Sequence, residues 1–139
     1  KNEYFNSYDR IEMETDFTGR VLRSRTQHDY PNKPTLTVEE RFTYDHTGRI
    51  LTQHHKVNNQ DEQLIAQNNY DAIGQLIKKN VGNIEANPLQ EIDYSYNIRG
   101  WLKSINKART ALDHDLFAMD IQYNTPINND ATSLYNGNI

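Results

Sequence analysis

The side chains of this chain that could hold a metal ion are its five histidines and its acidic residues. His54 and His55 are neighbours on a predicted strand, so their side chains point to opposite faces and cannot share one ion. The triplet Asp113, His114 and Asp115 has the composition of a zinc-binding fragment, but it is several times more typical of a solvated loop. Because the chain contains no cysteine, it has no thiolate metal site, disulfide or cysteine nucleophile. We predict that it has no metal site and no cofactor.

Three acidic residues, Asp16, Asp45 and Asp71, could serve as paired carboxylates in general acid–base catalysis. Their spacing instead places them at the tips of successive predicted hairpins, where each carboxylate closes its own turn. No serine lies in a Gly-x-Ser-x-Gly elbow, and the six glycines are isolated rather than gathered in a phosphate-binding loop. The sequence therefore predicts no catalytic residues and a protein that is not an enzyme.

The composition argues against two further classes of protein. With a net charge of −4 and only 15 Lys and Arg among 139 residues, the chain lacks the clustered positive charge of a general nucleic-acid-binding surface. No apolar run approaches the roughly 20 residues that span a bilayer as a helix. Nine tyrosines, four phenylalanines and one tryptophan favour a folded chain over a disordered one, and the length suits one domain.

A short repeat positions the turn acids. Four segments share an aromatic residue, Asp or Asn, two variable residues, glycine, a polar residue or Trp, and an apolar residue. They are residues 15–22, 44–51, 70–77 and 96–103, and only the first has Thr15 in place of tyrosine. Their glycines, Gly19, Gly48, Gly74 and Gly100, recur every 26 to 29 residues. This regular period indicates an array of repeats in a single region over residues 1–139, with turns at about 16–19, 45–48, 71–74 and 97–100.

Each repeat fits a β-hairpin with a type I turn followed by a bulge. The first turn residue, Asp16, Asp45, Asp71 or Asn97, binds the backbone two residues on, and glycine takes the left-handed position in which a Cβ would clash. This register predicts four cross-strand pairs, which are Thr15/Val21, Tyr44/Ile50, Tyr70/Leu76 and Tyr96/Leu102.

The residues between the turns favour strands. Alternating patterns predict strands over 35–44 and 90–96 and a further strand over 115–124, while 32–34, 58–61 and 81–88 have the composition of connectors. Only 107–112 has helical character. The fold predicted is all-β, with antiparallel hairpins in one continuous twisted sheet.

The unit Tyr-Asp-x-x-Gly-Arg-hydrophobic, which residues 44–50 match in full, resembles the YD repeat of the bacterial Rhs (rearrangement hotspot) proteins and the related teneurins. Residues 93–106, 115–119 and 135–139 are similar to segments of many bacterial YD-repeat proteins. The resemblance implies a segment of a β-shell, wound from many hairpins, that encloses a C-terminal toxin or variable domain in the bacterial proteins. The teneurin shell belongs to a cell-surface adhesion receptor, and YD repeats are often described as carbohydrate-binding.

We therefore expect a structural scaffold or shell segment of a longer, secreted, wall-associated or cell-surface bacterial protein. Its partners would be further repeats of the same chain, a C-terminal toxin or variable domain, and a second copy, with the N-terminal strand edge as the first choice of contact. The alternatives are a carbohydrate-binding or adhesion module, with Trp101, Tyr94 and Tyr96 stacking on sugar rings, and an enzyme with a dispersed site. Trp101 is the best candidate for exposure, whereas Arg20, Arg49 and Gln75 in the equivalent places predict an outward, solubilising row.

Overall fold

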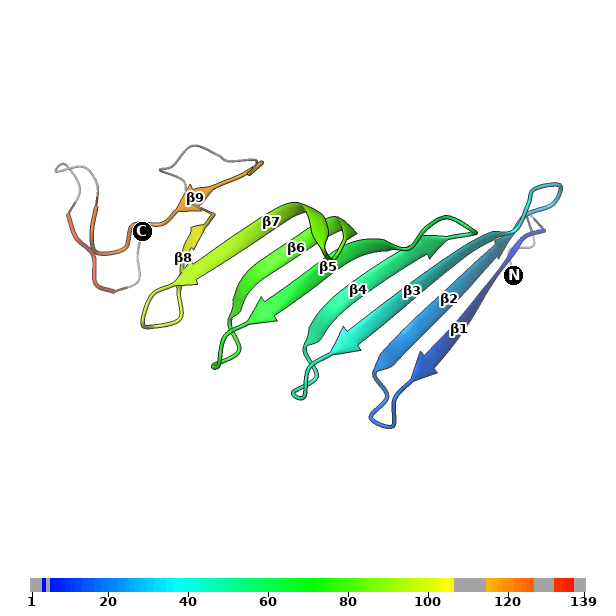
Figure 1. The fold of residues 1–139 in the computed structure, drawn as a ribbon, viewed down its shortest axis with the longest axis horizontal. Coiled ribbons are helices and arrows are strands. Elements are labelled where there is room, and N and C mark those ends of the chain that lie inside the picture. Colours follow the sequence, from blue (N-terminus) through cyan, green and yellow to red (C-terminus); the bar gives the residue numbers. More distant parts are fainter. Residues whose placement is uncertain (1–3, 5, 107–114, 127–131, 137–139) are drawn as a thin grey trace. The chain divides into compact units, whose positions relative to one another are not determined.

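The computed structural model of the chain describes residues 4, 6–106, 115–126 and 132–136. This part of the chain contains nine strands and no helix, and the strands form one antiparallel sheet in chain order from β1 to β9 (Figure 1). The all-β hairpin fold predicted from the repeats is confirmed. The strands are β1 Tyr8–Thr15, β2 Val21–Asp29, β3 Leu36–Tyr44, β4 Ile50–Val57, β5 Gln63–Tyr70, β6 Leu76–Ile84, β7 Asn87–Tyr96, β8 Leu102–Ile105 and β9 Met119–Asp120.

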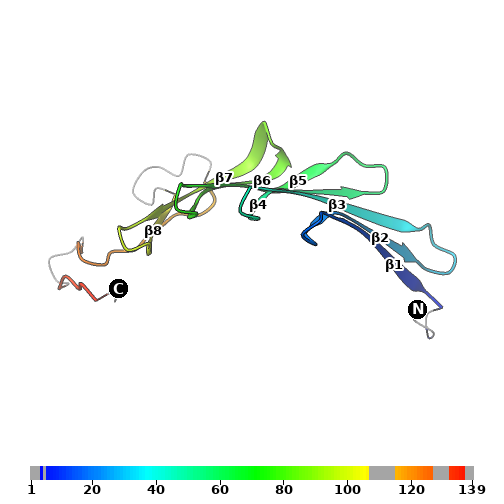
Figure 2. The ribbon, with the colours of Figure 1, turned by 90° about the horizontal axis from the view of Figure 1, so that it is seen from below.

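The contacts divide the chain into two compact units. Unit 1 consists of Lys1–Asn68 and Asn80–Leu89, and unit 2 consists of Asn69–Lys79 and Gln90–Ile139. In each unit the strands lie in a single layer, which Figure 2 shows edge-on. The buried apolar side chains of the described residues are only Leu64 and Ala66, both on β5 in unit 1. A single layer buries little, so hydrogen bonds and contacts between neighbouring strands have a large share in holding it together.

The four repeats form hairpins 1 to 4, made of β1–β2, β3–β4, β5–β6 and β7–β8. Their glycines, Gly19, Gly48, Gly74 and Gly100, have φ angles of +86°, +89°, +91° and +79°. In each turn the glycine N–H donates to the carbonyl of the first turn residue, over 2.9 to 3.1 Å. The predicted left-handed glycine is confirmed in all four turns.

The predicted cross-strand pairs are present wherever the register is defined at the turn. Thr15 lies opposite Val21, Tyr44 opposite Ile50 and Tyr96 opposite Leu102. One residue beyond each pair the register shifts, which leaves Leu22, Leu51 and Lys103 without an opposing residue. This second bulge was not predicted, because nothing in the alternation of the flanking residues marks it.

Asparagines end strands in both units by one shared device. Asn58 follows β4 and Asn106 follows β8, with φ angles of +50° and +51°. The Asn58 N–H donates to the carbonyl of Thr37, and its side-chain oxygen accepts from the Thr37 N–H, both over 2.8 Å. Asn106 makes the same two bonds with Asp93. The asparagine side-chain oxygen thus accepts the last hydrogen bond between the two strands, at a residue whose own backbone no longer has the conformation of a strand.

Two sequence expectations for strands are wrong. Residues 81–88 were expected to be a connector, yet β6 continues to Ile84 and β7 begins at Asn87. Positive φ at Gly82 and Asn83 lets the strand bulge and continue, and the Asn83 side chain donates to the Asn87 carbonyl over 2.7 Å.

The strand predicted over 115–124 is reduced to Met119–Asp120. Side chains take backbone groups just before it, because Gln90 accepts from the Leu116 N–H and Asn106 donates to the Phe117 carbonyl. At Leu116 and Phe117 these side-chain bonds take the place of backbone hydrogen bonds between strands. The helical character of 107–112 concerns residues outside the described part of the chain.

Candidate functional site

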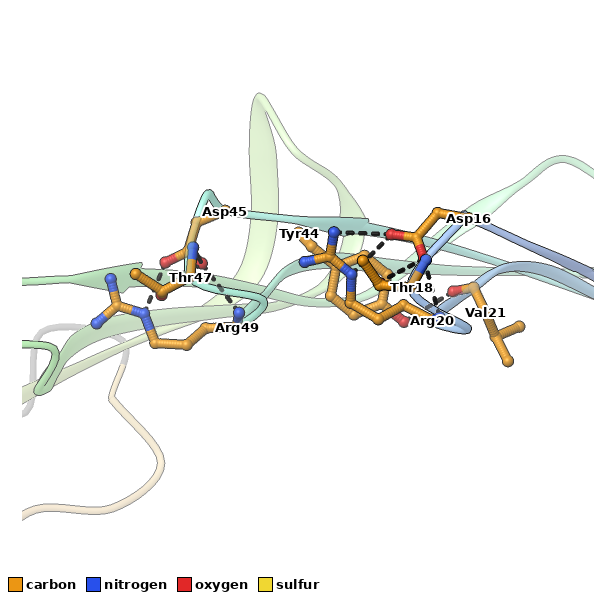
Figure 3. A network of polar contacts seen from close by, with 8 residues as sticks. All are labelled: Asp16, Thr18, Arg20, Val21, Tyr44, Asp45, Thr47 and Arg49. Carbon is orange, nitrogen blue, oxygen red and sulfur yellow. Dashed lines mark hydrogen bonds and ion pairs between the residues drawn. The ribbon is translucent and has the colours of Figure 1, made fainter.

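The most regular polar arrangement in the described residues surrounds the turn carboxylates. Asp16 Oδ1 accepts from the Thr18 N–H at 2.8 Å, the Thr18 hydroxyl at 2.6 Å and the Arg20 N–H at 3.0 Å. Its Oδ2 accepts from Arg20 Nε at 2.7 Å. Asp45 repeats all four bonds with Thr47 and Arg49, as Figure 3 shows.

Hairpins 3 and 4 keep the backbone half of this arrangement. Asp71 Oδ1 accepts from the backbone N–H groups of the residues two and four positions on, at 3.0 and 2.8 Å. Asn97 Oδ1 does the same with Arg99 and Trp101, at 2.9 and 3.0 Å. Since an amide can replace the carboxylate, the turn needs an acceptor oxygen rather than an acid. The acids lie at separate hairpin tips, and their oxygens are engaged in local bonds.

Hydrogen bonding lowers the pKa of two turn carboxyls well below the ordinary range. At Asp16 the hydroxyl of Thr18 has the largest effect, with further bonds from the backbone and guanidinium of Arg20, and these outweigh partial burial. At Asp45 partial burial raises the pKa, but the bonds from Arg49 and Thr47 together outweigh it. Both groups therefore stay ionised in the pH range in which a general acid would have to be protonated.

A tyrosine joins each of several hairpins to the one before it. The Tyr44 hydroxyl of hairpin 2 donates to the Val21 carbonyl of hairpin 1 at 2.7 Å, in unit 1 (Figure 3). In unit 2 the Tyr96 hydroxyl donates to the Leu76 carbonyl at 2.8 Å. In each case the tyrosine precedes the turn acid or amide, and the carbonyl belongs to the second residue after the previous glycine. We call this contact the tyrosine joint.

The joint also occurs after the last complete repeat. The Tyr123 hydroxyl donates to the Leu102 carbonyl at 2.8 Å, in the equivalent position. Tyr123 and Asn124 therefore begin a fifth unit that has the tyrosine joint. This unit lacks the turn glycine, because no glycine follows at the repeat spacing. The repeated Tyr was visible in the sequence, but its hydroxyl acceptor lies 20 to 23 residues earlier, so spacing within one repeat could not identify it.

The residue directly after the turn glycine covers the joint tyrosine. The Arg20 guanidinium lies 5.3 Å from the centre of the Tyr44 ring. Trp101 takes the same place in hairpin 4, with its ring 5.4 Å from that of Tyr123 and tilted by 43°. The side chains of Arg20 and Arg49, which were predicted to form an outward, solubilising row, are 34% and 31% exposed, and both guanidinium groups bind turn carboxylates.

The predicted glycan-stacking residues make different contacts. Trp101 is half-buried, with Tyr123 against it and the Arg99 guanidinium 5.1 Å from its ring. The Tyr96 hydroxyl is engaged in the joint with Leu76, while Tyr94 lies opposite Ile105 on β8. A hollow of about 290 Å³ lies beside Trp101, lined by Asn97, Ile98, Arg99, Trp101, Tyr123, Asn124, Leu134 and Tyr135.

Two histidines of the described residues, His54 and His28, make pairwise contacts. His54 is buried, with Nε2 3.1 Å from Glu85 Oε1, and the strand alternation turns the neighbouring His55 to the other face. His28 Nδ1 lies 2.6 Å from Asp9 Oδ1. Among the described residues no three His, Asp or Glu side chains gather as metal ligands, and Asp113 and His114 lie outside that part of the chain. No helix in the same part is long and apolar enough to cross a membrane.

Comparison with known proteins gives no relative: no family model, no curated protein and no solved structure matches the chain.

Proposed function

We propose that this chain is a non-enzymatic structural segment, in which each hairpin is built to be joined to the next. The observation that carries the proposal is the recurrence of the tyrosine joint, which Tyr44, Tyr96 and Tyr123 make with the same position of the preceding hairpin. A contact that recurs at the same position of several repeats belongs to the assembly of an array, whereas a catalytic site needs one set of convergent groups.

The array is proposed to belong to the YD-repeat proteins of the bacterial Rhs type. In hairpin 2 a contact or a backbone conformation accounts for each of the four named residues of the signature. Tyr44 makes the joint, Asp45 closes the turn, Gly48 takes the left-handed bulge and Arg49 binds the turn carboxylate. By this resemblance the chain is one stretch of a longer β-shell on an exported or cell-surface protein, with further repeats and a C-terminal toxin or variable domain as partners.

The coding sequence on both sides of the chain tests this proposal directly. Further Tyr-Asp-x-x-Gly units followed by an unrelated domain are expected. Flanking sequence without any such unit would contradict the shell segment. As a second test, the purified chain should show no turnover above buffer in a broad hydrolase and glycosidase screen, and activity lost on a single His, Asp or Glu substitution would refute the non-enzymatic role.

The second candidate function is carbohydrate binding, which the hollow beside Trp101 favours because aromatic side chains line it. A glycan array with the chain and its Trp101→Ala variant separates the two functions. Binding that is lost in Trp101→Ala and kept in Tyr30→Ala, at an exposed tyrosine outside the hollow, would support a glycan module. No binding above background is the result that the structural function predicts.

A further inference from the structure

The side chain that follows a turn glycine reaches the turn of the next hairpin. A Cβ built on Gly48 of hairpin 2 would lie 3.1 Å from Nη1 of Arg20 and 3.8 Å from its Cδ. Arg20 belongs to hairpin 1, where it comes directly after Gly19. Non-bonded heavy atoms in ordinary contact stand about 3.5–4 Å apart, so the lack of a Cβ at Gly48 makes room for this guanidinium.

The same approach occurs in unit 2, between hairpins 3 and 4. A Cβ built on Gly100 would lie 3.1 Å from Nε2 of Gln75, the residue directly after Gly74. A Cβ on Gly19, in contrast, would meet no atom of the described residues within 4 Å. Gly48 and Gly100 therefore share a contact with the preceding hairpin, in addition to the left-handed backbone that all four turn glycines have.

The turn carboxylate of hairpin 1 fixes the direction of Arg20. Asp16 Oδ2 accepts from Arg20 Nε at 2.7 Å and lies 2.7 Å from Nη2, so two of the three nitrogens of the planar guanidinium are held (Figure 3). The third nitrogen, Nη1, is the one that stands against Gly48. The guanidinium carbon also lies 5.3 Å from the centre of the Tyr44 ring. Asp16 thus holds Arg20 in an orientation in which it meets two residues of the next hairpin.

The residue types at the other turns agree with this arrangement. Hairpins 1 and 2, whose glycines are followed by Arg20 and Arg49, both have an aspartate at the turn that binds the arginine. Hairpin 4 combines Trp101, which has no charge to orient, with the amide Asn97. The Trp101 ring lies against Tyr123, and no glycine follows Tyr123 at the repeat spacing. A turn aspartate thus accompanies each arginine, and the unit after the bulky tryptophan lacks the glycine.

We propose that the aspartate and arginine of a turn form a recognition site for the hairpin that follows. In hairpin 1 the carboxylate of Asp16 is the positioning group, and the guanidinium of Arg20 makes the contact. The site fits a hairpin with an aromatic residue before its turn and glycine in its bulge, as Tyr44 and Gly48 provide. The inference rests on the structural function proposed above and adds to it the part of the next repeat that each turn recognises.

Alanine at two turn glycines tests the contact with a matched control. Gly19→Ala and Gly48→Ala carry the same backbone cost, because the φ angles are +86° and +89°. Gly48→Ala must also displace Arg20, so in urea denaturation it should raise the unfolding equilibrium constant at least about threefold more than Gly19→Ala does. This excess should disappear when both substitutions are made in Arg20→Ala. Equal effects in the unmodified chain, or an excess that survives Arg20→Ala, would overturn the proposal.

Asp16→Asn tests the positioning role of the carboxylate. The amide keeps an acceptor oxygen for the turn, as Asn97 does, and removes the charge that holds Arg20. Because the guanidinium is then released to move aside, the excess effect of Gly48→Ala should fall below about twofold. Asp71→Asn makes the same change in unit 2 and should leave the excess unchanged. An excess that is equally large in Asp16→Asn would overturn the proposed pair.

Two substitutions at Tyr44 separate this recognition from the tyrosine joint. Tyr44→Phe keeps the ring and removes the hydroxyl, so Arg20→Ala should raise the unfolding equilibrium constant by the same factor in Tyr44→Phe as in the unmodified chain. Tyr44→Leu removes the ring as well, and there the effect of Arg20→Ala should be at least about twofold smaller.

The same measurements distinguish failure of the inference from failure of the proposed function. If Arg20→Ala has one and the same effect in all three backgrounds, the arginine does not recognise the ring and the inference is overturned. The joint is measured by Tyr44→Phe alone, so a loss of stability in that variant would still support an array of joined hairpins.

Discussion

At the scale of single residues, the turn glycines are required by backbone conformation rather than by lack of space. Gly19 has a φ of +86°, yet a Cβ placed there would meet no atom within 4 Å. Gly48 differs, because its Cβ would lie 3.1 Å from the Arg20 guanidinium. Gly19 is therefore the position that isolates the cost of the left-handed conformation.

We predict that Gly19→Ala lowers the free energy of unfolding by about 1–2 kcal/mol, because an L-residue pays for a left-handed backbone. Gly19→Asn should cost clearly less, since asparagine tolerates this conformation and already adopts it at Asn58 and Asn106. Urea denaturation of the two variants measures the difference. Equal losses for alanine and asparagine would mean that the conformational explanation is wrong.

The turn carboxylates make the free energy of unfolding depend on pH in the acid range. The folded pKa of Asp16 and of Asp45 is lowered, so their contribution is fully present above the unfolded pKa of about 3.9 and is lost as the pH falls through the folded pKa. Asparagine at both positions keeps the acceptor oxygen, as Asn97 does naturally, and removes the charge.

The double variant Asp16→Asn/Asp45→Asn should therefore lose less stability than the unmodified chain between about pH 5 and pH 2. Some acid dependence should remain, because salt bridges from Arg23 and Arg41 also lower the pKa of Glu39 and Glu62. Thermal melts across this range provide the measurement. An acid dependence as steep as that of the unmodified chain would show that these carboxylates do not contribute.

At the scale of the hairpin, the tyrosine joint is the contact with the sharpest test. Tyr44→Phe removes the hydroxyl and leaves the Val21 carbonyl without that donor, which should cost about 0.5–1.5 kcal/mol of unfolding free energy. Tyr96→Phe removes the equivalent bond to Leu76 and should cost a similar amount. Tyr30→Phe, at an exposed connector tyrosine, is the control and should be near neutral.

The sequence predicts the hairpins well because the information is local. Asp45 and Gly48 stand within one turn, and together they determine its type and the pairing of Tyr44 with Ile50. The acceptor of the Tyr44 hydroxyl lies 23 residues away, in another hairpin, so no local pattern encodes it. The strand-ending role of Asn58 was missed for the same reason, because its partner Thr37 lies 21 residues away.

At the scale of the whole molecule, the question is what holds a single-layered sheet together when few apolar side chains of its described residues are buried. Unit 1 contains a row of opposed side chains of alternating charge across four strands, formed by Glu12, Arg25, Glu39 and Lys56. Exposed pairs of this kind contribute little each, so the row sets the register more than the stability. The tyrosine joint adds a contact that depends on the neighbouring hairpin being in place.

The central claim is that each joint tyrosine secures the hairpin that precedes it. Hydrogen–deuterium exchange of the chain and of Tyr44→Phe, resolved to individual strands, tests this claim most directly. We predict faster exchange in β2, which carries the Val21 acceptor, and in its hairpin partner β1, with exchange in the turn of hairpin 4 unchanged. Exchange that is unaltered in β1 and β2, or accelerated equally in every strand, would contradict the account.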